Sequence, residues 1–134
     1  MRDIKFRFWD DDQKEFTSKC YIEDGLVFKH LDYVTAVTRG DVIPLQFTGL
    51  KDKNGKEVYE SDIVVTKRHG YKYVVEYAEE LGQWGGKAID IDPKNNPYLR
   101  VKWMSFSQMV ENGLEFEVVG NKYENPELLE NKDV

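Results

Sequence analysis

The stretch that decides the fold is residues 46–64, QFTGLKDKNGKEVYESDIV. An apolar run over residues 42–50 leads into a polar segment, and the apolar pair Val58-Tyr59 follows that segment. Asn54-Gly55, inside the polar segment, can take positive φ at both positions, as a type I′ turn requires. The stretch therefore predicts a β-hairpin over residues 50–59 that turns at Asn54-Gly55.

Short runs with β-strand character lie on both sides of this hairpin. Residues 3–9 alternate between apolar and charged side chains, which predicts a half-buried strand. Residues 82–86, by contrast, are predicted to form a flexible, glycine-rich loop that carries Trp84. Further strands are predicted over residues 16–22, 26–28, 33–37, 63–66, 71–77, 88–91, 98–103 and 116–118.

One short helix is predicted near the C-terminal end. Ser105 can cap a helix over residues 106–112, because serine accepts hydrogen bonds from the first free backbone N–H groups. Phe106, Met109 and Val110 have the i, i+3, i+4 spacing of a packed helix face. We expect all three side chains to face the core.

Composition and charge set broad limits. The chain has 134 residues, 40% of them hydrophobic, so one domain, or a small domain with an extension, can fold without disulfides. A single cysteine, a charged N-terminus and the absence of a long apolar run favour the cytoplasm. Residues 111–134 contain seven acidic residues and two lysines, which gives this segment a net charge of −5. The whole chain has a net charge of −6. We expect this acidic tail to aid solubility or to bind a basic partner.

Three segments together resemble a known family. They are residues 46–64, residues 117–129 (EVVGNKYENPELL) and residues 4–9 (IKFRFW). In this order they resemble the YopX family of phage and prophage proteins over nearly the whole chain. The resemblance implies a mostly β fold: an SH3-like small β-barrel over residues 46–134 with an acidic C-terminal tail, one short helix, and a β-rich N-terminal extension over residues 1–45. It also implies the cytoplasm of a bacterial host cell, and it brings no site residues with it.

One position departs from the family pattern. Ser61 stands where the family usually has glycine, directly before Asp62. Serine tolerates positive φ less well than glycine does. Either this position does not need positive φ, or the turn there is slightly strained.

Catalytic and metal-binding motifs are not apparent. His30 and His69 have no second ligand at zinc-site spacing, and residues 90–92 lack the glycine and acid that a calcium loop needs after them. Cys20 lies in a predicted strand with no nucleophile signature around it, which favours a buried structural thiol. We therefore expect no enzyme activity, no metal and no cofactor.

A non-enzymatic interaction module is the leading functional hypothesis, with a host or phage protein, or a second copy of the chain, as its partner. The alternative is a nucleic-acid-binding accessory protein, because residues 67–73 interleave basic and aromatic side chains. An enzyme with a scattered site is a third hypothesis, and no membrane contact is expected. The candidate contact residues are Lys67, Arg68, Tyr71, Lys72, Tyr73, Trp84, Arg100 and Lys102.

The first strand bears on assembly. Its apolar face would carry Ile4, Phe6 and Phe8, and exposing each of these side chains forfeits roughly 1.5–3 kcal/mol. We therefore expect this face to pack on other strands of the extension, on the barrel, or on a second subunit in a homo-oligomer. Exposure to solvent is the least expected outcome.

Overall fold

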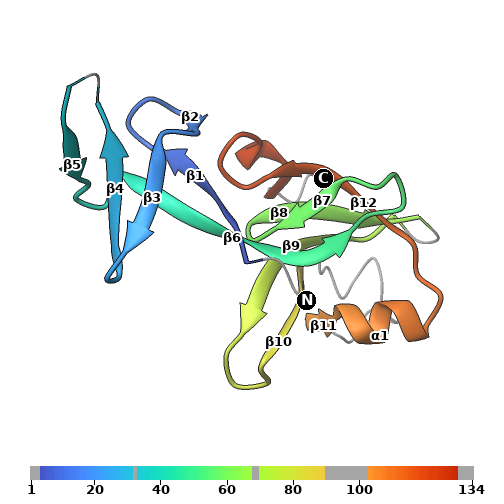
Figure 1. The fold of residues 1–134 in the computed structure, drawn as a ribbon. Helices are drawn as coiled ribbons and strands as arrows, with labels where there is room; N and C mark the ends of the chain where they lie inside the picture. The colour runs from blue at the N-terminus through green and yellow to red at the C-terminus, as the bar shows by residue number, and fades with distance from the viewer. Residues whose placement is uncertain (1–3, 32, 68–69, 90–102, 130–134) are drawn as a thin grey trace.

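The computed structural model describes residues 4–31, 33–67, 70–89 and 103–129 (Figure 1). In this part of the chain 55% of the residues lie in β-strands and 9% in helices. The mostly β fold predicted from the sequence is therefore confirmed. Most of the predicted strand over residues 98–103 lies outside the described residues.

The described chain contains twelve strands, one α-helix and one 3-10 turn. In chain order they are β1 Phe6–Asp10, β2 Glu15–Thr17, β3 Cys20–Glu23, β4 Leu26–His30, β5 Thr35–Val37, β6 Val42–Lys51, β7 Glu57–Tyr59, β8 Asp62–Thr66, β9 Lys72–Ala78, β10 Gln83–Ala88, β11 Trp103–Ser105, α1 Phe106–Glu111, β12 Phe116–Asn121 and η1 Pro126–Leu129. The single strand predicted over residues 16–22 is wrong: it is two strands, because β2 pairs with β1 whereas β3 pairs with β4.

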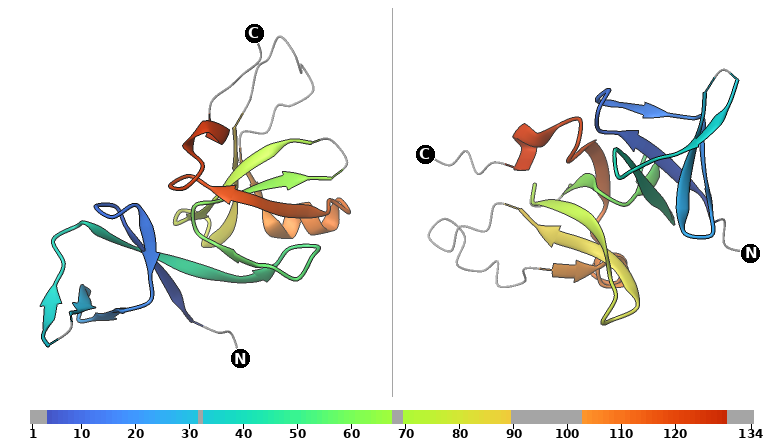
Figure 2. Two further views of the ribbon diagram at one scale, coloured as in Figure 1. Left: turned by 90° about the horizontal axis from the view of Figure 1, so that it is seen from above. Right: turned by 90° about the vertical axis from the view of Figure 1, so that its left-hand side faces the viewer.

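The strands form three sheets, with the orders β2-β1-β6-β7, β11-β10-β9-β8-β12 and β3-β4-β5. Figures 1 and 2 show β1 to β5 on one side of the molecule and β7 to β12 with α1 on the other, with β6 running between them. The five-stranded sheet curls into a half-barrel, while the SH3-like detail stays a prediction. The boundary expected between residues 45 and 46 falls inside β6.

Strand β6 changes partner along its length. Residues 42–46 pair with β1, from Val42 opposite Asp10 to Gln46 opposite Phe6. From Phe47 onward the same strand pairs with β7, across a register shift. One continuous strand therefore belongs to both halves of the molecule.

The hairpin at Asn54-Gly55 is confirmed, but the type I′ turn is wrong. Among the described turn residues only Gly55 has positive φ, at 82°. The N–H of Gly55 donates to the carbonyl of Asp52 at 3.0 Å, and the N–H of Asp52 donates to the carbonyl of Lys56 at 2.8 Å. This is a type I turn followed by a left-handed glycine. The Asp52 carboxylate favours it by accepting the N–H groups of Asn54 and Lys56, both at 2.9 Å.

The same carboxylate ties the hairpin to the last strand. Its Oδ2 accepts the N–H of Val118 at 2.9 Å, and the N–H of Lys53 donates to the carbonyl of Phe116 at 3.1 Å. Burial raises the pKa of Asp52, but the three backbone N–H donors outweigh burial and hold the pKa below its ordinary value.

The helix prediction is confirmed except at one residue. The Ser105 hydroxyl accepts the N–H of Gln108 at 3.1 Å, and Phe106 and Met109 are buried in the hydrophobic core of the half-barrel. Val110, however, is 68% exposed, so its predicted place in the packed face is wrong. Successive helical residues are about 100° apart, and this single short helix packs through the narrow stripe of Phe106 and Met109.

The face prediction for the first strand is largely wrong. Phe8 is buried as predicted, but Ile4 is 75% exposed and Phe6 is 37% exposed. The opposite face, expected to meet solvent, carries Arg7 and the buried Trp9 and faces the other half of the molecule. Alternation identified the strand, but it could not show that a charged residue would find a buried partner 55 residues away.

Arg7 and Asp62 form the central contact between the two halves. The guanidinium of Arg7 lies between the rings of Phe16, at 4.5 Å, and Tyr59, at 4.7 Å, and donates to Oδ1 of Asp62. Asp62 is buried, and its other oxygen accepts the N–H of Tyr59 at 2.8 Å. Burial raises the pKa of Asp62, and the Arg7 guanidinium offsets part of that rise.

Trp9 adds an aromatic contact beside this pair. Its indole meets the ring of Phe16 edge-on at 5.0 Å and stacks on Tyr123 at 5.7 Å. Tyr123 follows β12, so the first strand of the chain packs on its C-terminal part. The contact between Trp9 and Tyr123 joins segments more than 100 residues apart.

Ser61 resolves the question raised by the family pattern. It lies between β7 and β8 with φ at 73°, and it is buried. Its N–H donates to the carbonyl of Val75 at 2.8 Å, and its carbonyl accepts the N–H of Lys122 at 3.0 Å. These two bonds hold the backbone in the left-handed region, so the position does need positive φ, and serine is strained there.

Replacing Arg7 with alanine should destabilise the fold by about 3–5 kcal/mol, because it leaves the buried Asp62 carboxylate without its counter-charge. Lys5→Ala is the control, since it removes the exposed Lys5–Glu57 pair and should cost about 0–1 kcal/mol. Urea unfolding followed by circular dichroism measures both. Equal losses of stability in the two variants would contradict the central place of Arg7.

Ser61→Gly should stabilise the protein by about 1 kcal/mol, because glycine has no Cβ to strain at positive φ. Ser107→Gly, the same substitution at an exposed position of α1, should instead destabilise by about 0.5–1 kcal/mol. Thermal melting of the two variants should therefore give shifts of opposite sign. A lower melting temperature for Ser61→Gly would show that the serine is not strained.

Candidate functional site

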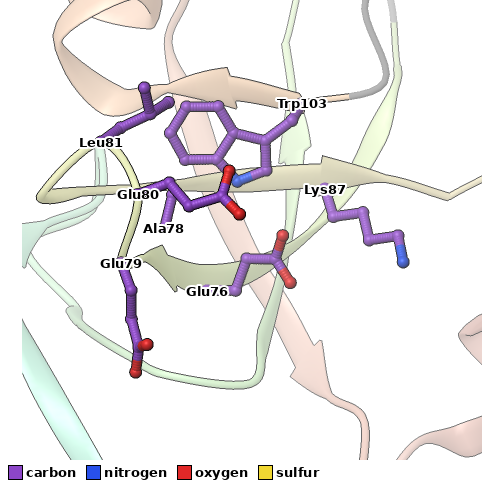
Figure 3. Close-up of a pocket in the computed structure, with 7 residues that line it drawn as sticks. All are labelled: Glu76, Ala78, Glu79, Glu80, Leu81, Lys87 and Trp103. Carbon is purple, nitrogen blue, oxygen red and sulfur yellow. The ribbon is translucent and has the colours of Figure 1, made fainter.

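A pocket of about 480 Å³ opens where the β9–β10 hairpin meets β11 (Figure 3). We call it the hairpin pocket. Its size lies within the range of small-ligand sites. The residues that line it are Glu76, Ala78, Glu79, Glu80, Leu81, Lys87 and Trp103.

Strand register explains why these side chains meet. Glu76 on β9 lies opposite Gly85 on β10, and Trp103 on β11 lies opposite Lys87. A Cβ on Gly85 would sit 2.5 Å from Cζ2 of the Trp103 indole and 2.5 Å from the carbonyl oxygen of Met104. The glycine therefore leaves the space in which the indole reaches across β10 and forms one wall of the pocket.

Gly86 serves the opposite face of the same strand. A Cβ there would lie 2.6 Å from Cβ of Tyr73, whose ring is buried in the core. The loop predicted over residues 82–86 is therefore wrong, since Gln83–Ala88 is strand β10. Close packing on the two faces of the sheet requires both glycines. Adjacent glycines in a sequence are equally typical of a loop, so the pattern alone does not reveal this packing.

The described residues that line the pocket carry more negative than positive charge. Glu76, Glu79 and Glu80 face a single cation, Lys87, and none of the four takes part in an ion pair found among the described residues. Figure 3 shows the carboxylates of Glu76 and Glu80 turned toward the middle of the lining residues, while Glu79 points away. The arrangement suits binding of a cation.

The residues singled out by sequence lie elsewhere. Lys67 is exposed and lies 3.7 Å from the carboxylate of Glu115. Tyr73 is 2% exposed, so its ring belongs to the core and not to a stacking surface. Trp84 is half-buried, with its ring edge against Tyr77 at 5.1 Å on the core side of the sheet. Tyr71 and Lys72 are half-buried at the start of β9, and Arg68, Arg100 and Lys102 lie outside the described residues.

None of the described pocket residues is among the contact residues predicted from the sequence. A usable signal was present, because Glu76 lies in the strand predicted over residues 71–77, and two further glutamates follow that strand before Gly82. The part played by Trp103 carried no local signal. It reaches the pocket only through the pairing of β11 with β10.

A second candidate surface lies on the three-stranded sheet. The loop between β4 and β5 carries Leu31, Tyr33 and Val34, which are 51%, 98% and 61% exposed. We call these three side chains the apolar tip. A hydrogen bond of 2.7 Å from the N–H of Leu31 to the carbonyl of Val34 closes the loop. Large apolar side chains grouped in this way on a surface are typical of contact sites.

The apolar tip continues onto one face of the sheet. Tyr21 and Phe28 stack at 5.2 Å, and Val37 lies opposite Phe28 on the neighbouring strand. The other face is held to the first sheet by Lys29, whose Nζ donates to Oδ2 of Asp10 at 2.7 Å. Pairing with Lys29 lowers the pKa of the buried Asp10.

The described residues contain neither an activated cysteine nor a cluster of metal ligands. Cys20 is half-buried, and burial raises the pKa of its thiol, the reverse of what an activated nucleophile needs. Within the described ranges, no three His, Cys, Asp or Glu residues are grouped so as to hold a metal ion. Nor does any helix there have the length and apolar character needed to cross a membrane.

Comparison with known proteins gives the family and the fold. The model of the YopX protein family matches residues 5–130. The chain is similar to protein EF1440 from Enterococcus faecalis, whose crystal structure superposes with a TM-score of 0.57. The two sequences are 25% identical, and the match covers 97% of this chain and 100% of EF1440. The crystal structure of yopX from Bacillus subtilis is 20% identical, with a TM-score of 0.54 and the same coverage. No curated protein matches.

Gly85→Ala should destabilise the protein by about 1–3 kcal/mol, because the new methyl group meets the Met104 carbonyl, which cannot move aside as a flexible side chain can. Gln83→Ala, at an exposed position of the same strand, is the control and should be nearly neutral. Urea unfolding measures the cost, and indole fluorescence reports displacement of Trp103. An unchanged midpoint for Gly85→Ala would mean that the Met104 carbonyl and the indole do not lie where this geometry places them.

Proposed function

Since this chain belongs to the YopX family, for which no chemistry can be carried over, we propose from its surfaces that it is a phage- or prophage-encoded, non-enzymatic interaction module. Its partner is a host or phage protein in the bacterial cytoplasm. The observation that carries this proposal is the apolar tip, which extends three large side chains into solvent from a short sheet.

The chemistry of the tip supports a protein partner. Tyrosine is enriched among the residues that dominate binding energy at protein interfaces, and Tyr33 is 98% exposed here. Leu31 and Val34 flank it and would add apolar area around an inserted ring. A tip of this kind can insert into a preformed pocket on a partner. Insertion would bury most of the apolar surface of the tip, which favours binding.

Self-association is a form of the same function. Ile4 and Phe6 are exposed beside the buried Phe8, so part of the first strand's apolar face remains available to a second copy. Burying these two side chains would favour a symmetric homo-oligomer. Light scattering of the wild-type protein separates self-association from binding to a different protein.

The nucleic-acid alternative has less support. The basic stretch over residues 67–73 contributes Tyr73 to the core, and Lys67 lies near the Glu115 carboxylate. The net charge of −6 opposes approach to phosphate. Labelled single-stranded DNA across a salt series is the test, and steeply salt-dependent binding would replace the proposal with this alternative.

Changing Tyr33 and Val34 to serine together should reduce capture of the protein partner at least tenfold, since the inserted apolar area is lost. Tagged wild type and the variant are exposed to lysate of phage-infected host cells, and bound proteins are quantified by mass spectrometry. Light scattering at micromolar concentration measures self-association in parallel.

Val110→Ser is the matched control, because Val110 on α1 is 68% exposed and Val34 is 61% exposed. This variant should capture the partner as wild type does. Wild-type oligomers that dissociate in the tip variant would identify a second copy as the partner of the tip, whereas oligomers that persist in it would place self-association on Ile4 and Phe6. Identical capture by wild type, tip variant and control would refute a contact through the tip.

A further inference from the structure

We propose that the hairpin pocket receives a lysine side chain of a partner protein, with the ammonium group between Glu76 and Glu80 and the aliphatic stem along Trp103. This inference rests on the proposed interaction function and supplies the chemistry of a second contact, separate from the apolar tip. It assigns a binding site to the β9–β10 hairpin.

The charge balance of the pocket points to a cationic ligand. Among the described residues, three carboxylates and one ammonium line it, and no ion pair found in this part of the chain neutralises any of them. Two buried carboxylates elsewhere in the chain do form ion pairs: Asp10 with Lys29, and Asp62 with Arg7. The pocket therefore holds an excess of negative charge that an incoming cation would balance.

The aromatic wall is an independent feature that fits the same ligand. Gly85 allows the Trp103 indole to extend across β10, and the indole is only half-buried there. Tryptophan is the best aromatic partner for a cation placed over its ring face. A pocket with carboxylates on one side and an indole on another can thus contact an ammonium group in two ways.

The apolar lining fits the stem of the side chain. Ala78 and Leu81 line the pocket beside Trp103, and Leu81 is 59% exposed in the free chain. A lysine side chain carries four methylene groups below its charge and packs them on apolar surface when the head is paired. A bare metal ion would gain nothing from these contacts, and an anion would be repelled by the glutamates.

Lys87 gives the pocket a direction. Figure 3 shows it at the end of the pocket away from the hairpin turn, beyond Glu76. An incoming ammonium placed beside Lys87 would meet a like charge, so it is directed toward the side of Glu80 and Leu81.

The test uses the full chain labelled with ¹⁵N and a five-residue peptide, blocked at both ends, with one lysine at its centre. Two-dimensional NMR should show a saturable shift of the Trp103 indole N–H resonance. The same peptide with Nε-acetyl-lysine keeps the stem but loses the charge, and it should cause no shift at equal concentration. Spermidine is titrated separately, and binding of spermidine without the peptide would reject a protein source for the cation.

Glu76→Gln with Glu80→Gln should weaken peptide binding at least tenfold, since both carboxylates are lost while side-chain size is kept. Glu23→Gln with Glu111→Gln is the control, because it removes the same total charge at two exposed positions on β3 and α1. The control should bind within about twofold of wild type. Equal losses in the two double variants would mean general attraction to an acidic surface and would overturn the site.

Other outcomes are equally decisive. Binding of the acetylated peptide as tight as that of the lysine peptide, or no shift at millimolar peptide, also overturns the inference. If the tip variants still lose their partner while the lysine peptide fails, the interaction function stands and only this site falls. If partner capture is insensitive to the tip and the peptide also fails, both proposals fall.

Discussion

The contact between Arg7 and Asp62 is the constraint on which the rest of the structure depends. A buried carboxylate is tolerated only when a counter-charge and hydrogen bonds compensate for the lost water, and here Arg7 and the N–H of Tyr59 supply both. The two rings around the guanidinium fix its position, so β1 can dock in one register only. That register sets the pairing of β1 with β6, and β6 in turn carries the chain into the half-barrel.

A few buried polar residues organise the turns of the half-barrel in the same manner. Asp52 shapes its own hairpin and also accepts the N–H of Val118, so one carboxylate sets both a local turn and a contact across 66 residues. Asn121 does comparable work after β12, where its Oδ1 accepts the N–H groups of Tyr123 and Glu124. Turn chemistry and tertiary contacts therefore reinforce each other.

Local signals in the sequence predicted the local structure well. The hairpin at Asn54-Gly55 and the cap at Ser105 depend on neighbouring residues, and both are present. The type of the turn is an exception, because the nearby Asp52 decides it. Most other failures share one cause: they depend on partners far along the chain. Gly85-Gly86 has the composition of a loop, yet it lies in a strand. The missing side chains leave room for Trp103 on one face of that strand and for Tyr73 on the other. For the same reason the place of Trp103 in the pocket could be recognised only after β10 and β11 were paired.

The strand shared by the two halves has a consequence for the order of folding. During synthesis β1 leaves the ribosome long before β6 and before Asp62, so its guanidinium must wait in water with no partner. Contacts of such long sequence separation form late, because closing a large loop costs entropy before any contact is gained. The N-terminal half is therefore completed only when the half-barrel has formed, and a chain stalled early in translation would present its first strand, with Ile4, Phe6 and Phe8 all uncovered, to chaperones.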